Sequence, residues 1–163
     1  MSGIREILTK IKSIQSTKKI TRAMEMVAVS KMRKAQDLMQ ASQAYADKIL
    51  GVVAHVACST SEYRHPLLLP RELKQRVGLV VISTDRGLCG GLNTNLFKQI
   101  LIQLRQWHNQ DLEVHAGLIG AKSENFFKRL KNIQIKATAA HLGDKPEVNH
   151  LLGVVSPLIK AYL

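Results

Sequence analysis

Residues 83–93, STDRGLCGGLN, contain the residue types in this chain that most suggest chemistry. They follow a short apolar run and precede a helical pattern, and open parallel sheets usually bind ligands at such strand-to-helix turns. Glycines at this place let the backbone approach a phosphate, and the first turn of the helix supplies N–H donors. A phosphate-binding loop is therefore one hypothesis for the segment.

The spacing of the glycines does not favour that hypothesis. Neither G-x-G-x-x-G nor G-x-x-x-x-G-K-[ST] occurs, and Gly91 is followed by Leu-Asn rather than by Lys-Ser. The alternative is that Gly87, Gly90 and Gly91 form a tight turn between a buried strand and a closely packed helix. We favour the turn and expect no nucleotide or other cofactor here.

Cys89 also invites a chemical interpretation, because a helix N-terminus lowers the pKa of a thiol. No His or Lys lies nearby in the sequence to act as its base, so a nucleophile is disfavoured. Asp85 and Arg86 are expected to form a local ion pair or a docking contact. The predicted structural or docking turn consists of Asp85, Arg86, Gly87, Cys89, Gly90 and Gly91.

No other segment has the spacing of a catalytic or metal site. Paired carboxylates, H-E-x-x-H and G-x-S-x-G are absent from the sequence. The two cysteines, Cys58 and Cys89, and the six scattered histidines have no ligand spacing. We therefore predict no catalytic residue and no bound metal.

The region around the turn alternates between strand and helix patterns. Residues 77–83 form a continuous apolar, β-branched run, which is typical of a strand buried on both faces. Further strands are predicted at 113–119 and 133–137, and helices at about 93–107, at 123–130 and from Pro146 onward. This alternation indicates an α/β fold, a partial Rossmann-like parallel sheet with flanking helices over residues 76–163. Because such sheets rarely stop at three strands, we expect further sequence beyond Leu163.

Residues 1–58 are predicted to form one long helix. Beyond Gly3 the stretch to Val56 contains no proline and only one further glycine, Gly51. Apolar or small residues recur at a spacing of three and four, which indicates a coiled-coil seam over seven heptads, broken at Lys10 and Lys31. The seam comprises Ile7, Ile14, Thr17, Thr21, Met24, Ala28, Ala35, Leu38, Ser42, Tyr45, Ile49, Val52 and Val56.

The length of this helix requires a partner. About 55 helical residues span roughly 80 Å, whereas a compact chain of this size is only about 40 Å across. Half of the helix must therefore project from the rest, and its apolar stripe needs a cover. We divide the chain into the helix at 1–58, half of an antiparallel coiled-coil shaft, a linker at 59–75 and an incomplete α/β domain at 76–163.

The charge is strongly positive, with a formal net charge of +12. Residues 1–56 hold ten Lys/Arg against four Asp/Glu, and the remainder holds fourteen against eight. A basic helix attracts nucleic acid, an anionic membrane surface or an acidic protein surface, or is simply solvated. Nucleic acid is disfavoured, because the helix has one aromatic residue, Tyr45, and its basic residues are dispersed.

Three segments closely resemble the gamma subunit of F-type ATP synthases. They are 20–35, ITRAMEMVAVSKMRKA, the turn 83–93, and 119–122, IGAK. The resemblance covers all 163 residues but only the N-terminal part of the family's length. The start of the chain has no presequence, which favours a bacterial member.

The resemblance implies a rotor shaft. In the family the N-terminal helix winds against a C-terminal helix inside a ring of alternating alpha and beta subunits. The α/β domain lies below, next to the epsilon subunit and the membrane c-ring, and rotation of the shaft couples proton flow to ATP synthesis. In the family, nucleotide is held by the alpha and beta subunits, so the resemblance implies a non-catalytic subunit. We expect no nucleic-acid partner and no direct small-molecule substrate.

The resemblance also implies a location and a contact surface. The expected location is the cytoplasmic face of the bacterial inner membrane, as a peripheral membrane protein. The basic helix is expected to face a carboxylate-rich loop of the beta subunit, while the chain by itself is expected to self-associate through its seam. The predicted contact residues are Lys18, Lys19, Arg22, Met24, Lys31, Arg33 and Lys34.

Overall fold

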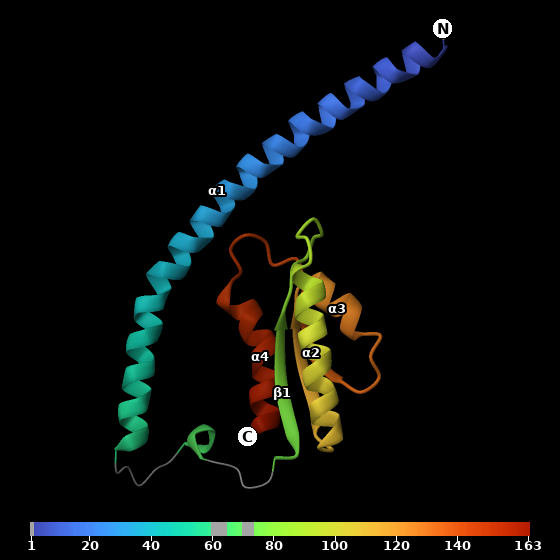
Figure 1. Cartoon of the computed structure of the whole chain (residues 1–163). Coiled ribbons are helices and arrows are strands. Elements are labelled where there is room, and N and C mark those ends of the chain that lie inside the picture. Colours follow the sequence, from blue (N-terminus) through green and yellow to red (C-terminus); the bar gives the residue numbers. More distant parts are fainter. Residues whose placement is uncertain (1, 60–64, 70–73) are drawn as a thin grey trace. The chain divides into compact units, whose positions relative to one another are not determined.

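The computed structural model describes residues 2–59, 65–69 and 74–163 (Figure 1). The chain divides into two compact units, Met1–Tyr63 and Arg64–Leu163, which are described separately. The predicted linker at 59–75 includes residues 60–64 and 70–73, which lie outside the described residues. The domain boundaries therefore stay a prediction.

The first unit is the helix α1, Ser2–Cys58, of 57 residues. The predicted long helix is confirmed, and it continues two residues beyond Val56. Its side chains from Gly3 to Cys58 are all exposed, including Ile14 at 68% and Tyr45 at 71%. At 1.5 Å per residue the helix is about 85 Å long, and within its unit no described residue covers the apolar seam.

Hydroxyl groups along α1 bond to the helix's own backbone. Thr9, Thr17 and Thr21 donate through Oγ1 to the carbonyl four residues earlier, at 2.9, 3.0 and 2.9 Å. Ser42 donates to the carbonyl of Leu38 at 3.0 Å. Such back-bonding bends helices, and α1 curves gently along its length in Figure 1.

The second unit is an α/β fold, as predicted. Its elements are the short 3-10 turn η1, Pro66–Leu68, and then β1 Arg76–Ile82, α2 Leu92–Asn109, β2 Glu113–Ile119, α3 Ala121–Phe127, β3 Gln134–Ala139 and α4 Val148–Tyr162. The three strands are parallel and lie in the order β1-β2-β3. The register of β1 on β2 runs from Arg76 opposite Glu113 to Ile82 opposite Ile119.

Helices cover the sheet on both faces (Figure 1). On the face of α2 and α3, the core consists of Val81, Phe97, Ala116, Leu118 and Phe127. On the opposite face α4 approaches β2 closely at Gly117. A Cβ added to this glycine would lie 2.8 Å from Cγ1 of Val154 and 3.0 Å from Cδ1 of Leu158. The close approach explains a glycine in the central strand.

One prediction about the sheet is wrong. The first strand was expected to be buried on both faces, but β1 is buried on only one: Val81 is 1% exposed, whereas Val80 is 41% and Ile82 68% exposed. The physical reason is the position of α4, which lies mainly against β3 and β2 and reaches β1 only slightly. The apolar face of β1 opposite to α2 is therefore left open in the described unit.

Candidate functional site

The carboxyl ends of the strands bring two of the three sequence motifs together. The turn after β1 and the segment 119–122 after β2 are joined by backbone contacts. Ser83 N–H donates to the carbonyl of Ile119 at 2.8 Å, and Lys122 N–H donates to the carbonyl of Thr84 at 3.2 Å. Ser123 N–H donates to Oγ of Ser83 at 2.8 Å. Two motifs that are 36 residues apart thus form one cluster.

Asp85 extends this cluster to the third strand. Its Oδ1 accepts the backbone N–H of Ala121 at 2.9 Å and that of His141 at 3.1 Å. The bond from His141, followed by that from Ala121, holds the pKa of the Asp85 carboxyl below its ordinary value. The described contacts include no ion pair between Asp85 and Arg86, and the Arg86 charge lowers the pKa of the Asp85 carboxyl less than the two backbone hydrogen bonds do. Asp85 is bonded mainly to the backbone.

Gly120 allows the two segments to meet. Its φ is +98°, and a Cβ at this position would lie 2.2 Å from the carbonyl oxygen of Ser83. Its N–H donates to the carbonyl of Ala139 at 2.7 Å, which ties β2 to the end of β3. The backbone conformation and the lack of space both require glycine here.

The turn itself is held by side chains that the sequence analysis did not single out. Oδ1 of Asn93 accepts the N–H of Thr84 at 3.3 Å, and its Nδ2 donates to Oγ1 of Thr84 at 2.7 Å and to Sγ of Cys89 at 3.3 Å. The described hydrogen-bond partners of the Cys89 thiol are thus an amide and a hydroxyl, neither of which is a base. The nucleophile hypothesis gains no support.

The predicted glycines of the turn have different roles. Gly90 has a φ of +58°, the left-handed conformation that favours glycine. Added Cβ atoms at Gly87 and Gly91 would meet nothing closer than an ordinary contact with Asn95. Leu88 also has a positive φ, +63°, and its side chain is 96% exposed. An apolar side chain held at the tip of an ordered turn suits a docking contact better than a core.

A hollow of about 490 Å³ lies between this turn and the helices α2 and α3. Its apolar floor includes Phe97 and Phe126, which stack with ring centroids 4.6 Å apart. Lys98, Lys122 and Arg129 line it, and none of its lining residues is acidic. No sequence pattern brings these three cations together, although Lys122 belongs to the IGAK motif. The hollow has the charge to accept an anionic group.

The seven predicted contact residues of α1 are all exposed, but they do not share one face. At 3.6 residues per turn, Lys18, Arg22 and Arg33 lie on one side of the helix, whereas Met24 and Lys31 lie on the seam side. One flat partner surface therefore does not contact them all at once. Their role stays a prediction.

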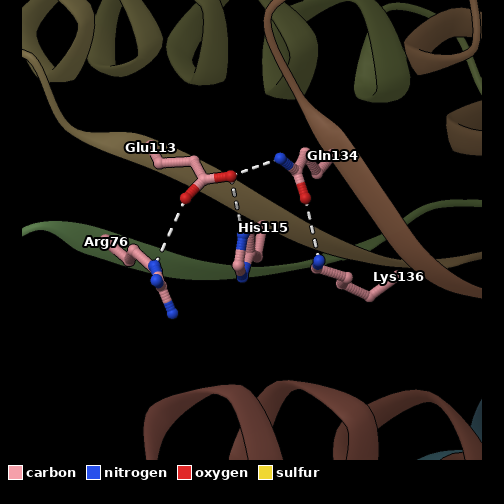
Figure 2. A network of polar contacts seen from close by, with 5 residues as sticks. All are labelled: Arg76, Glu113, His115, Gln134 and Lys136. Carbon is pink, nitrogen blue, oxygen red and sulfur yellow. Dashed lines mark hydrogen bonds and ion pairs between the residues drawn. The ribbon is translucent and has the colours of Figure 1, made fainter.

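A polar network crosses the amino ends of the strands (Figure 2). Glu113 on β2 pairs with Nε of Arg76 on β1 at 3.3 Å and accepts a hydrogen bond from Gln134 on β3. Lys136 donates to Oε1 of Gln134 at 2.8 Å. This network links all three strands and was not predicted from the sequence, because its members lie up to 60 residues apart.

His115 is the buried member of that network, at 5% exposure. Its Nε2 lies 3.2 Å from Oε1 of Glu113 but lacks the alignment of a directed hydrogen bond. The contact with His115 is the largest cause that holds the pKa of Glu113 below its ordinary value, ahead of the Arg76 charge. The network stabilises the sheet electrostatically.

Neither a metal centre nor a membrane span emerges from the described part of the chain. The described side chains do not bring three or more His, Cys, Asp or Glu together. Within the same residues, no helix combines the length and the apolar character needed to cross a bilayer.

Comparison with known proteins identifies the chain. A profile of the ATP synthase family matches residues 3–163. The chain is 51% identical over 162 residues to the "ATP synthase gamma chain" of Histophilus somni (strain 129Pt), of Pasteurella multocida (strain Pm70) and of Legionella pneumophila (strain Paris). Each match covers 99% of this chain and 55–56% of the relative.

The chain thus spans about half the length of the curated relatives it matches. The family profile covers nearly the whole chain, the identity is high, and the resemblance seen in the sequence motifs is confirmed. On this evidence the chain belongs to the ATP synthase family, and its relatives are gamma chains.

Proposed function

We propose that this chain acts in the central-stalk rotor of a proton-translocating F-type ATP synthase. Rotation of the shaft couples proton flow through the membrane sector to ATP synthesis at the beta subunits. The proposal is supported by family membership and carried by one observation, the uncovered 57-residue helix α1. In this role the chain is non-catalytic.

The uncovered seam of α1 supports a shaft built from two helices. A single exposed helix with apolar residues at a spacing of three and four is the pattern of one strand of a coiled coil. The gamma-subunit resemblance supplies its partner, a C-terminal helix that runs antiparallel, with the alpha and beta subunits of the catalytic ring around both. The exposure of Ile14 and Tyr45 fits this arrangement.

The α/β unit is proposed to lie below the ring, next to the epsilon subunit and the c-ring of the membrane sector. The protein would then be peripheral to the cytoplasmic face of the inner membrane. The ordered turn after β1 supports a docking role there, since Leu88 is exposed beside the hollow lined by Lys98 and Lys122. An acidic partner surface would complement it.

The basic residues of α1 are proposed to face a carboxylate-rich loop of the beta subunit. Attraction between charges acts over about 8–10 Å at physiological salt and needs no single docked geometry. Such a contact tolerates rotation of the shaft, whereas a close apolar lock does not. The dispersal of the cations around α1 fits a contact that must persist as the helix turns.

The test is charge reversal in the assembled enzyme with a full-length gamma chain. Arg22→Glu and Lys34→Glu should lower the ratio of ATP-driven proton pumping to ATP hydrolysis, because each turns an attraction into a repulsion. Lys145→Glu makes the same charge change in an exposed loop of the α/β unit and serves as the control. Wild-type coupling in both helix variants would contradict the proposed contact.

A further inference from the structure

A second hollow lies at the end of the α2–α3 face that is remote from the turn. It has a volume of about 280 Å³ and lies between the C-terminal half of α2 and the connection from α3 to β3. We call it the basal hollow. Its floor is apolar and is formed by Leu101, Leu104, Leu112, Val114, Leu130 and Ile133. Leu104, Leu130 and Ile133 also pack against the hydrophobic core, so the floor is continuous with that core.

The rim of the basal hollow is cationic. Arg105, His108 and Lys131 line it together with the amides of Asn109 and Asn132, and no lining residue is acidic. The helix α2 itself, LNTNLFKQILIQLRQWHN, contains no Asp or Glu. The nearest carboxylates in the sequence, Asp111 and Glu113, flank Leu112 and are not among the lining residues.

The cations of the rim differ from others in the same unit. Lys128 pairs with Glu124 at 2.6 Å, and Arg76 pairs with Glu113 at 3.3 Å. Among the contacts that the structure describes, by contrast, the side chains of Arg105 and Lys131 take part in no ion pair or hydrogen bond. An apolar depression with two such cations at its rim is complementary to an apolar group with carboxylates beside it.

We propose that the basal hollow docks an acidic segment of a partner protein, which inserts one apolar side chain. A small hollow of about 280 Å³ with an apolar floor has room for one large apolar side chain as an anchor, and its two rim cations suit acidic neighbours of that side chain. Anchors of this kind in small pockets, with charges at the rim, dominate many interfaces. The site is distinct from the turn and from the seam of α1, and the inference does not rest on the rotor role.

Site-specific photo-cross-linking in the cells that make the protein tests the proposal. Asn132→p-benzoylphenylalanine places the cross-linker at the hollow and leaves Arg105, His108 and Lys131 in place. Asn149→p-benzoylphenylalanine is the matched control, an exposed asparagine on α4, on the opposite face of the sheet. The expected product joins position 132 to a segment of another protein that has several Asp or Glu around a large apolar residue, and position 149 does not give it.

Charge reversal then tests the chemistry. Arg105→Glu with Lys131→Glu should lower the yield of that product at least tenfold, whereas Lys145→Glu with Lys160→Glu, the same change at exposed sites away from the hollow, should not. Cross-links only to lipid, to a second copy of this chain or to a neutral or basic segment would overturn the proposal, as would the lack of any product. A cross-linker at Arg22 of α1 reports the rotor contact separately, so failure at one place is distinguishable from failure at the other.

Discussion

At the scale of residues, Asp85 joins the carboxyl ends of three strands through one carboxylate. It follows β1, and it accepts N–H groups from Ala121 after β2 and from His141 after β3. Hydrogen bonds to a charged acceptor are stronger than those between neutral groups, and a donor that loses its acceptor is costly when it is shielded from water. Asp85 is thus a structural residue of the turn, whatever the turn docks against.

Asp85→Ala should destabilise the α/β unit by about 0.5–1.5 kcal/mol at pH 7, because two backbone donors, one exposed and one partly buried, lose their acceptor. Asp85→Asn keeps one acceptor oxygen and should cost less. Urea unfolding followed by the fluorescence of Trp107, the single tryptophan of the chain, measures both. If the Asn and Ala variants are as stable as the native chain, the two hydrogen bonds that Asp85 accepts do not stabilise the unit.

The same carboxylate makes stability depend on pH. Its pKa is lower in the folded chain than its ordinary value of 3.8, so its contribution is present above about pH 4 and is lost as the pH falls through the folded pKa. The difference in stability between the native chain and Asp85→Ala should therefore shrink below pH 4. A difference that stays constant down to pH 2 would show that the charge is irrelevant.

The pair of His115 and Glu113 gives a second prediction about a pKa. Because the contact with His115 is the largest cause of the low pKa of Glu113, His115→Leu should raise that pKa toward its ordinary value. Arg76→Ala removes a smaller cause and should raise it less. Carbon-13 NMR titration of the Glu113 carboxyl in the native chain and in both variants measures the two pKa changes. A larger increase in Arg76→Ala than in His115→Leu would contradict the prediction.

The sequence allowed the turn to be predicted as a unit but not its partners. Residues 83–93 stand out because glycines cluster between a strand pattern and a helix pattern. The contacts of Asp85 with Ala121 and His141 cross 36 and 56 residues, and no local pattern reports them. Lys98 and Arg129 likewise meet at one hollow only because α2 and α3 cover the same face of the sheet.

At the scale of elements, the alternation of strands and helices was the best-predicted feature. The bounds of β2 agree with the prediction at both ends, since polar or turn residues flank its apolar run. The predicted burial of β1 on both faces was wrong, because an apolar run in the sequence does not show which helices or strands pack against it. Its two faces are distinguished only by where α4 crosses the sheet.

The two faces of β1 can be tested with adjacent residues. Val81→Ala should cost roughly 2 kcal/mol, because it removes atoms from the fully packed core. Ile82→Ala should change stability by less than about 0.5–1 kcal/mol, because the side chain is 68% exposed. Urea unfolding of the two variants measures the contrast. Equal losses would mean that the open face of β1 is covered in solution.

At the scale of the whole molecule, the two units differ in how much they bury. The α/β unit has its own core of Val81, Phe97, Leu118 and Phe127, whereas the seam of α1 remains open in its unit. Length and periodicity predicted that the helix needs a partner. They did not identify the partner, because many amphipathic helices could pack against the same apolar seam.

The chain by itself should therefore self-associate through α1. Size-exclusion chromatography with light scattering should show dimers or larger species, since burial of the seam stabilises the helix. Leu38→Lys with Ile49→Lys places charges on the seam and should shift the chain toward monomer, whereas Lys12→Glu with Lys48→Glu serves as a surface control. A well-behaved native monomer would contradict the prediction.

The hydroxyls along the seam of α1 have a consequence for burial. Thr17, Thr21 and Ser42 already donate to the carbonyls of their own helix. A helix that packs against the seam therefore leaves no hydroxyl donor of these residues unpaired. The polar positions of the seam can be covered at little cost, and an apolar partner needs no matching acceptor.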